Sequence, residues 1–214
     1  GRRLPLTPRV EVTIVEEAQP RLLSFRRGDL DYVEVPTSIS NTVLAGDRLL
    51  PELAQRGVRL HRTTDPALGF VFFNLDDPVV GGYTPERVAL RRAITMARDR
   101  KSASAILSHG QATPADQLVP PPVPGHEPSF AFRDPYDPAA ARALLDRFGY
   151  RDRDGDGFRE APDGKPLTLV QSSTPDSDSR EADTLWLKNM AAIGIKMTVN
   201  SQPFNDLLKR KLPG

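Results

Sequence analysis

Three aspartates at alternate positions form the pattern in this chain that comes nearest to a metal site. Asp152, Asp154 and Asp156 are followed by Gly157, as in the opening of a calcium-binding loop. That spacing suits Ca²⁺ because the ion takes several carboxylate oxygens at once. The twelfth position of such a loop uses a bidentate glutamate, and here it holds Asp163.

Two further features of this loop argue against calcium. Arg159 occupies the eighth position, which is usually apolar, and residues 166–171 have the pattern of a strand where an EF-hand requires a helix. We therefore interpret residues 152–157 as the acidic, glycine-rich turn of a β-hairpin. No metal is expected, and calcium at the three aspartates is kept as a minor alternative.

The residue patterns that are typical of other kinds of catalytic chemistry are absent from the sequence. The three histidines, His61, His109 and His126, match no zinc spacing. No motif of a serine nucleophile, a zinc hydrolase or a phosphate-binding loop occurs. Cysteine is absent, which excludes thiol nucleophiles, thiolate metal sites and disulfides. We expect no enzymatic activity and no cofactor.

The aromatic run at residues 70–75 is a candidate binding surface. In a strand, Phe70 and Phe72 share one face while the side chains between and after them share the other. One face can therefore be core while the other lines a cleft. Trp186, the only tryptophan, lies between two leucines in a predicted helix, and we expect it to pack in the core.

Composition narrows the class of protein. A length of 214 residues with 38% apolar residues is sufficient for one large domain or two lobes. The 29 basic residues nearly cancel the 28 acidic ones, so nucleic acid is not an expected partner. No apolar run is long enough to span a membrane, and no signal peptide is visible. The lack of cysteine fits an oxidising compartment.

Hydrophobic periodicity and caps predict alternating strands and helices. Strands are predicted at residues 10–15, 30–35, 58–61, 70–75, 166–171 and 195–200. Helices are predicted at residues 17–27, 84–97, 101–107, 137–148, 179–193 and 204–211, and residues 37–55 are expected to be mostly helical. This order indicates an α/β fold with a mixed β-sheet flanked by helices.

Motifs along nearly the whole chain resemble those of one protein family. Phe73-Asn74, Pro78 and residues 91–100 are similar to its "FN…P…RxAxxxAxDR" signature, and residues 136–167 are similar to "YDP…A…LL…GY.D.DGDG…DGKPL". Residues 28–31 and 186–195 resemble two further motifs. The family is family 5 of the periplasmic, or extracytoplasmic, solute-binding proteins of peptide and nickel ABC importers, which includes oligopeptide- and dipeptide-binding proteins.

The resemblance implies a periplasmic-binding-protein type II-like fold, in which two lobes close around a solute and deliver it to an ABC transporter permease in the inner membrane. Residues 1–64 would be a partial segment of the lobe that holds the termini, and residues 65–214 most of the opposite, ligand-binding lobe. A monomer, periplasmic or otherwise extracytoplasmic, is expected, as the central part of a longer protein. A peptide is the expected ligand, and nickel chelates, haem, sugars and antibiotic-like peptides remain open.

The resemblance also nominates contact residues. Phe70, Phe72 and Asn74 would face the cleft, with Ser173 and Thr174 in the loop after the next strand. Peptide-binding relatives often have tyrosine or an acidic residue at the two phenylalanine positions, so the resemblance does not imply that a free amine is recognised there. The alternative function is a calcium-stabilised extracellular module that binds a partner protein.

Overall fold

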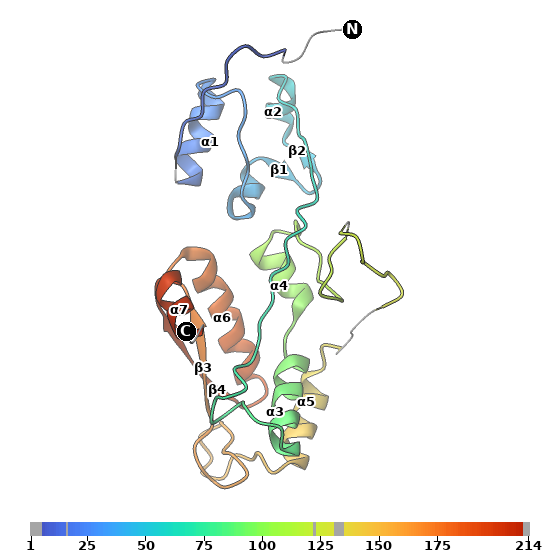
Figure 1. The fold of residues 1–214 in the computed structure, drawn as a ribbon, viewed down its shortest axis with the longest axis vertical. Helices are drawn as coiled ribbons and strands as arrows, with labels where there is room; N and C mark the ends of the chain where they lie inside the picture. The colour runs from blue at the N-terminus through green and yellow to red at the C-terminus, as the bar shows by residue number, and fades with distance from the viewer. Residues whose placement is uncertain (1–5, 16, 122, 131–134, 212–214) are drawn as a thin grey trace. The chain divides into compact units, whose positions relative to one another are not determined.

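The structure is a computed structural model, and it describes residues 6–15, 17–121, 123–130 and 135–211 (Figure 1). The chain divides into two compact units, residues 1–60 and residues 61–214. In the described parts of both units, no helix is long and apolar enough to cross a membrane. The assignment of residues 1–64 and 65–214 to two different lobes stays a prediction.

The first unit combines short helices with a small hairpin. Its helices are α1 (Ala18–Arg27), the 3₁₀ helix η1 (Thr37–Thr42) and α2 (Pro51–Gln55). Strands β1 (Leu44–Ala45) and β2 (Arg48–Leu49) pair antiparallel. Four apolar side chains from these helices and their ends form its core, namely Leu22, Ile39, Val43 and Leu53.

The prediction that residues 37–55 are mostly helical was wrong between η1 and α2. Gly46 has a φ of 60° and begins the two-residue turn of the hairpin. A glycine in that position suits a tight hairpin turn and breaks a helix. Pro51 then begins a new helix, since its ring is tolerated at the first helical position.

The strands predicted at residues 10–15, 30–35, 58–61 and 70–75 are not formed. None of these segments pairs with another strand in the described part of the chain. Alternation of apolar and polar residues indicates which side chains would share one face of a strand. A strand also requires a neighbouring strand that pairs with its backbone N–H and C=O groups. Without one, alternating positions such as Val12 stay exposed, in this case by 84%.

The second unit contains a pair of packed helices and a parallel strand pair with a helix along it. Helices α3 (Pro85–Met96) and α5 (Pro138–Arg147) pack side by side, and α6 (Ser177–Ala191) lies along β3 (Thr168–Ser173) and β4 (Lys196–Ser201), as Figure 1 shows. Helices α4 (Arg100–Leu107) and α7 (Phe204–Lys211) complete the unit. The helices outside residues 37–55 agree closely with the predictions.

Strands β3 and β4 are parallel, with Thr168 opposite Lys196 and Ser173 opposite Ser201. A parallel pair cannot be joined by a tight turn, so the chain crosses over through α6. Both strands confirm the predictions at residues 166–171 and 195–200. They differ from the four missing strands in having each other as partners.

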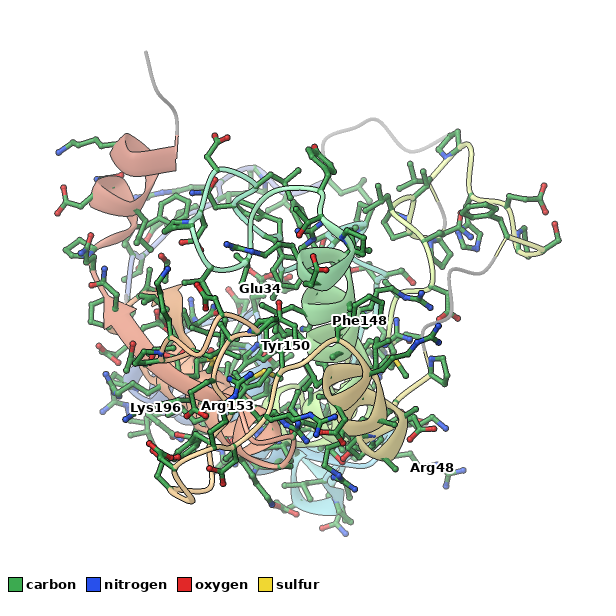
Figure 2. All side chains as sticks on the ribbon, turned by 90° about the horizontal axis from the view of Figure 1, so that it is seen from below. Glu34, Arg48, Phe148, Tyr150, Arg153 and Lys196 are labelled. Carbon is green, nitrogen blue, oxygen red and sulfur yellow. The ribbon has the colours of Figure 1, made fainter. Side chains whose placement is uncertain are left out.

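The core of this unit joins α3, α5 and α6 to the strands. Tyr150, marked in Figure 2, is only 2% exposed, and its hydroxyl donates to the carbonyl of Glu86 at 3.1 Å. Burial raises the pKa of Tyr150. The apolar residues of the same core that are 0% exposed are Leu90, Ala93, Ala141, Leu145, Met190 and Ile193. This core fixes α3 relative to β3, and those two elements border the cavity described next.

Candidate functional site

A cavity of about 300 Å³ lies within the second unit, between the segment before α3 and the elements β3 and α6. All three cleft residues predicted in the first of these segments line it: Phe70, Phe72 and Asn74. The other lining residues are Val71, Phe73, Asp77, Val79, Val80, Ile94, Thr168, Leu169, Val170, Gln171, Ser172, Trp186, Met190 and Met197. Most of the lining residues are thus apolar, and five are polar.

The phenylalanines of the cavity wall differ in their exposure. Phe70 and Phe72 are 65% and 56% exposed, and their ring centroids lie 6.3 Å apart. Phe73 packs instead against the core. Large exposed rings held beside a cavity provide apolar surface that a bound solute can cover.

Residues 74–82 form a tight loop held by its own polar side chains. Asn74 accepts a hydrogen bond from the amide of Asp76 at 3.1 Å. Oδ1 of Asp77 accepts two hydrogen bonds, from the amides of Val79 and Val80 at 2.7 and 2.9 Å. These bonds satisfy backbone groups that no regular element would satisfy.

Helix α3 fixes this loop from outside. Arg87 donates to the carbonyl of Val79, and Arg91 donates to the carbonyls of Val80 and Gly82 at 2.6 and 2.8 Å. The loop backbone also passes so close to Gly81 that a Cβ there would lie 2.3 Å from the carbonyl oxygen of Leu75. The cavity wall is therefore a fixed surface.

Trp186 also contributes to the wall of the cavity. We expected a core residue, and its ring does pack against the core, but it also lines the cavity. The guanidinium carbon of Arg98 lies 5.1 Å from the centroid of this ring. Burial, and secondarily the charge of Arg100, lowers the pKa of Arg98. The tryptophan is thus held between core and cation at the edge of the cavity.

Ser173 and Thr174 do not line the cavity, although their neighbour Ser172 does. Ser173 is buried and its carbonyl accepts from the amide of Gln202 at 2.9 Å. The hydroxyl of Thr174 donates to Asp176, the N-cap residue of α6, at 2.5 Å. Ser173 therefore joins the end of β3 to the segment after β4, while Thr174 helps to build the start of α6. Their contact with a ligand stays a prediction.

The N-cap of α6 has a perturbed carboxyl group. The hydrogen bond from Thr174, and then that from the amide of Ser179, lower the pKa of Asp176 to about 2. The hydrogen bond from the amide of Ser179 to Oδ1 of Asp176 is 2.8 Å long. The N-terminus of a helix also favours a negative charge. Asp176 therefore stays ionised, which keeps the helix start next to Ser172 in place.

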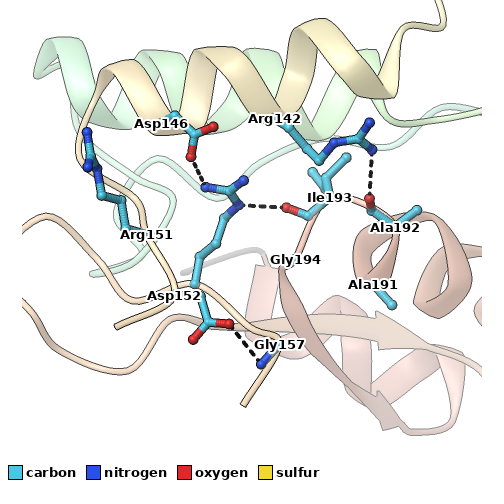
Figure 3. Close-up of a pocket in the computed structure, with 10 residues that line it drawn as sticks. Arg142, Asp146, Arg151, Asp152, Gly157, Ala191, Ala192, Ile193 and Gly194 are labelled. Carbon is cyan, nitrogen blue, oxygen red and sulfur yellow. Dashed lines mark hydrogen bonds and ion pairs between the residues drawn. The ribbon is translucent and has the colours of Figure 1, made fainter. Parts of the chain in front are cut away.

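A larger depression of about 730 Å³ lies elsewhere on the second unit (Figure 3). Its polar groups already bind one another. Arg159 donates to the carbonyls of Ile193 and Tyr150 at 2.9 and 2.6 Å and to Asp146 at 2.5 Å. Arg142 donates to the carbonyl of Ala192 at 3.1 Å. These bonds join segments of the fold, so we assign the candidate site to the smaller, aromatic cavity.

The acidic loop beside this depression brings its three aspartates together. One oxygen from each of Asp152, Asp154 and Asp156 lies within 4.8 Å of the others, and all three residues are exposed. Asp152 accepts from the amides of Gly155 and Gly157 at 2.7 and 3.0 Å, and the other two each accept from an amide two residues ahead.

The ends of the same loop form an antiparallel bridge between Arg151 and Glu160, as a hairpin turn requires. The carboxylates therefore organise the turn through its own backbone. Arg159, at the eighth position of the calcium pattern, points instead into the junction of α5 and α6. Its role there explains why the apolar residue of a calcium loop is missing.

The sequence did not identify Asp77, Gln171 or Trp186 as site residues, though all three line the cavity. The spacing of Asn74 and Asp77 in a Pro- and Gly-containing stretch is a signal for a turn, but not for a cavity. Gln171 and Trp186 reach the cavity only because β3 and α6 fold against the segment before α3. That arrangement is a matter of tertiary structure, so the sequence pattern did not indicate it.

Comparisons with known proteins bear on the fold and on the family of the chain. The family model described as bacterial extracellular solute-binding proteins, family 5 middle, matches residues 1–213. Di/tripeptide-binding protein 2 of Pseudomonas aeruginosa is 28% identical over 213 residues, which are 98% of this chain and 35% of that protein. Heme-binding protein A of Haemophilus influenzae is 24% identical over 217 residues, 99% of this chain and 35% of that protein.

Among solved structures, the oligopeptide-binding protein AppA of Bacillus subtilis, in complex with a nonapeptide, matches with a TM-score of 0.66 at 21% identity. The match covers 94% of this chain and 37% of that one. It confirms the predicted α/β fold of the periplasmic-binding-protein type II-like class.

The chain spans about a third of the length of the curated relatives it matches, and the family match extends over almost all of the chain. The family match confirms the resemblance seen in the sequence motifs. The chain belongs to family 5 of the bacterial extracellular solute-binding proteins.

Proposed function

We propose that the protein is the substrate-binding component of an ABC importer, which captures a peptide or peptide-like solute and delivers it to the permease. The observation that carries this proposal is the aromatic cavity of a family member, with Phe70 and Phe72 exposed at its wall. Relatives named as di/tripeptide- and oligopeptide-binding proteins support a peptide as the solute.

Binding would be driven by the removal of apolar surface from water. A volume of about 300 Å³ is at the lower end of ligand pockets, so it would hold a side chain or a short segment of a peptide. The phenyl rings would supply area, while Asn74, Gln171 and Ser172 would fix orientation through hydrogen bonds. Closure of a second lobe over the solute would complete its capture.

Three further properties belong to this proposal. The protein would work outside the cytoplasm, where family 5 proteins meet their solutes. It would act as a monomer, and it would bind its solute without chemical conversion. The sequence contains no motif of a nucleophile or a hydrolytic metal site that would favour catalysis.

Haem is the second candidate solute. One relative, which matches 99% of this chain, is named as a heme-binding protein. Flat aromatic rings such as Phe70, Phe72 and Trp186 can stack against a porphyrin. The calcium-stabilised interaction module has no such support, since the relatives found are solute-binding proteins.

A thermal-shift screen on the full-length gene product tests the proposal, because a ligand that binds the native state raises its melting temperature. The screen includes di- to octapeptides, haem, a nickel chelate and calcium. We expect peptides to raise the melting temperature in a concentration-dependent way. A rise with calcium alone, or hydrolysis of a bound peptide, would contradict the proposal.

A further inference from the structure

One face of α3 carries a row of arginines together with an isoleucine that lines the aromatic cavity. Four residues of this face follow one another at intervals of four, three and four: Arg87, Arg91, Ile94 and Arg98. Arg98 lies just after the C-cap Ala97, whose backbone is still in the right-handed helical region. Because Ile94 lines the cavity, this face of α3 is directed toward the cavity wall.

The arginines of this face differ in what they bind. Arg87 and Arg91 donate to backbone carbonyls of the loop at residues 74–82. The guanidinium of Arg98 makes no hydrogen bond or ion pair with any described residue, although the side chain is half-buried. Its carbon atom lies instead 5.1 Å from the centroid of the Trp186 ring. The tryptophan, and not the backbone, therefore accounts for the position of Arg98.

The ring of Trp186 is held by two different neighbours. It packs against the core, and the guanidinium of Arg98 lies over it. Planar guanidinium groups stack well on aromatic faces, and tryptophan is the most favourable partner. Arg98 does not line the cavity, whereas Trp186 does. The cation thus holds the ring from outside the cavity and leaves part of it as cavity wall.

A ring held in place offers a flat, rigid surface to a solute. A planar aromatic side chain can lie against such a surface with most of its area, and aromatic pairs gain a further attraction from their geometry. A branched aliphatic side chain of similar size covers a flat wall less completely. A ring that was free to turn would adapt to both shapes, so the preference depends on what holds the ring.

We propose that Arg98 is a positioning residue for solute binding: it fixes the indole of Trp186 in the cavity wall, and the fixed ring makes the cavity prefer a flat aromatic side chain to a branched aliphatic one. This inference rests on the proposed function, because it specifies a side chain of the captured solute. Arg98 stands at an open position of the RxAxxxAxDR signature, so resemblance to the family assigns it no role.

Calorimetric titration of the full-length gene product with two matched pairs of probes tests the inference. The peptide pair is Ala-Phe-Ala and Ala-Leu-Ala, and the non-peptide pair is 3-phenylpropanamide and 4-methylpentanamide. Within each pair, the ratio of the two dissociation constants measures the preference for the aromatic member. This ratio is the readout, because a general loss of stability would weaken both members alike.

The variants separate the charge of Arg98 from its bulk. Arg98→Met and Arg98→Gln remove the charge and keep an unbranched side chain, and Arg98→Lys keeps a cation. Arg92→Met is the matched control, since Arg92 belongs to the same helix, is exposed and makes no hydrogen bond or ion pair with the residues that the structure describes.

We expect the wild type to bind the aromatic member of at least one pair about fivefold or more tightly than the aliphatic member. Arg98→Met and Arg98→Gln should reduce this preference to about twofold or less. Arg98→Lys should keep most of it, because an ammonium group over the ring still makes a cation–π contact. Arg92→Met should leave the ratio unchanged.

A double-mutant cycle tests whether Arg98 acts through the ring. Trp186→Leu removes the aromatic surface, so Arg98→Met should have no further effect on the ratio in that background. A further loss of preference in the double variant would show that Arg98 acts by another route and would contradict the inference.

The two proposals fail differently. If the peptides bind but the wild type has no aromatic preference, or keeps it in both neutral variants of Arg98, the positioning inference is wrong and peptide capture stands. If only the non-peptide pair binds, with a ratio that depends on Arg98, the inference stands and peptide capture is wrong. If no probe binds the wild type, both are wrong.

Discussion

Arg159 shows how a single charged residue can hold segments distant in sequence. Its guanidinium donates to Asp146 at the end of α5, to the carbonyl of Tyr150, and to the carbonyl of Ile193 after α6. The side chain is only 12% exposed. A buried cation is stable only when its donors are used, and here they are used by the fold itself.

We therefore expect Arg159→Ala to destabilise the protein by about 2–4 kcal/mol, since it removes several charge-assisted hydrogen bonds and leaves buried carbonyls unpaired. Arg142→Ala is the control, because Arg142 is exposed and donates to one carbonyl. Its effect should be about 0.5 kcal/mol or less. Urea denaturation of both variants measures the difference, and equal effects would contradict the role of Arg159.

At the same scale, single residues explain what the sequence could predict of the site. Phe70, Phe72 and Asn74, which were predicted from the sequence, line the cavity, and their contact with a solute stays a prediction. Asp77 escaped notice because an aspartate in a turn usually serves the backbone, and in part it does so here. Its place in the cavity wall depends on the tertiary fold around it.

Among the elements, helices were predictable and most strands were not. A helix satisfies its own hydrogen bonds, so periodicity and caps such as Asp137, which accepts from the amide of Ala140, indicate it directly. A strand depends on a partner that can lie anywhere in the chain. Only β3 and β4 have one another, so of the six strands predicted only these two were correct.

The loop at residues 74–82 gives a prediction at this scale. Gly81→Ala would place a methyl group 2.3 Å from the carbonyl oxygen of Leu75 and 2.4 Å from that of Asp77. Backbone atoms cannot move away as side chains do, so we expect a loss of about 1–3 kcal/mol and weaker solute binding. Thermal unfolding and a binding titration measure both effects.

Gly69→Ala is the control for this variant. Gly69 precedes the aromatic run, and a Cβ there would meet no atom within 4 Å. It should therefore leave stability and binding close to wild type. If Gly81→Ala behaved in the same way, the loop could not be the fixed wall that the structure shows.

The start of α6 gives a pH-dependent prediction. The pKa of Asp176 lies at about 2, below its ordinary value of 3.8. A depressed pKa means that the folded state holds the ionised form more firmly than the unfolded state does. This contribution to stability is complete above about pH 4 and is lost as the pH falls toward 2.

Asp176→Asn should therefore show a weaker loss of stability between pH 4 and pH 2 than the wild type. Asparagine can still cap the helix, so the variant should fold at neutral pH. Asp65→Asn, at an exposed carboxylate, is the control and should follow the wild type. Circular dichroism during acid titration gives the comparison, and identical acid profiles for Asp176→Asn and wild type would contradict the assignment.

For the whole molecule, family membership and the local site rest on different parts of the chain. The family model covers residues 1–213, while the cavity uses only residues of the second unit. The match therefore establishes membership, and the cavity supplies the residues through which the proposed capture of a solute can be tested. Composition could indicate a globular protein, but the position of the cavity needed the folded structure.

The most direct test of this account is a calorimetric titration of the full-length gene product with the peptides that raise its melting temperature. The wild type is compared with the double variant Phe70→Ala/Phe72→Ala, and with Tyr83→Ala as an exposed aromatic control outside the cavity. We expect the double variant to lose about tenfold or more in affinity, because partial burial of two phenyl rings contributes a few kcal/mol, and Tyr83→Ala to bind normally. Unchanged affinity in the double variant would contradict the assignment of this cavity as the binding site.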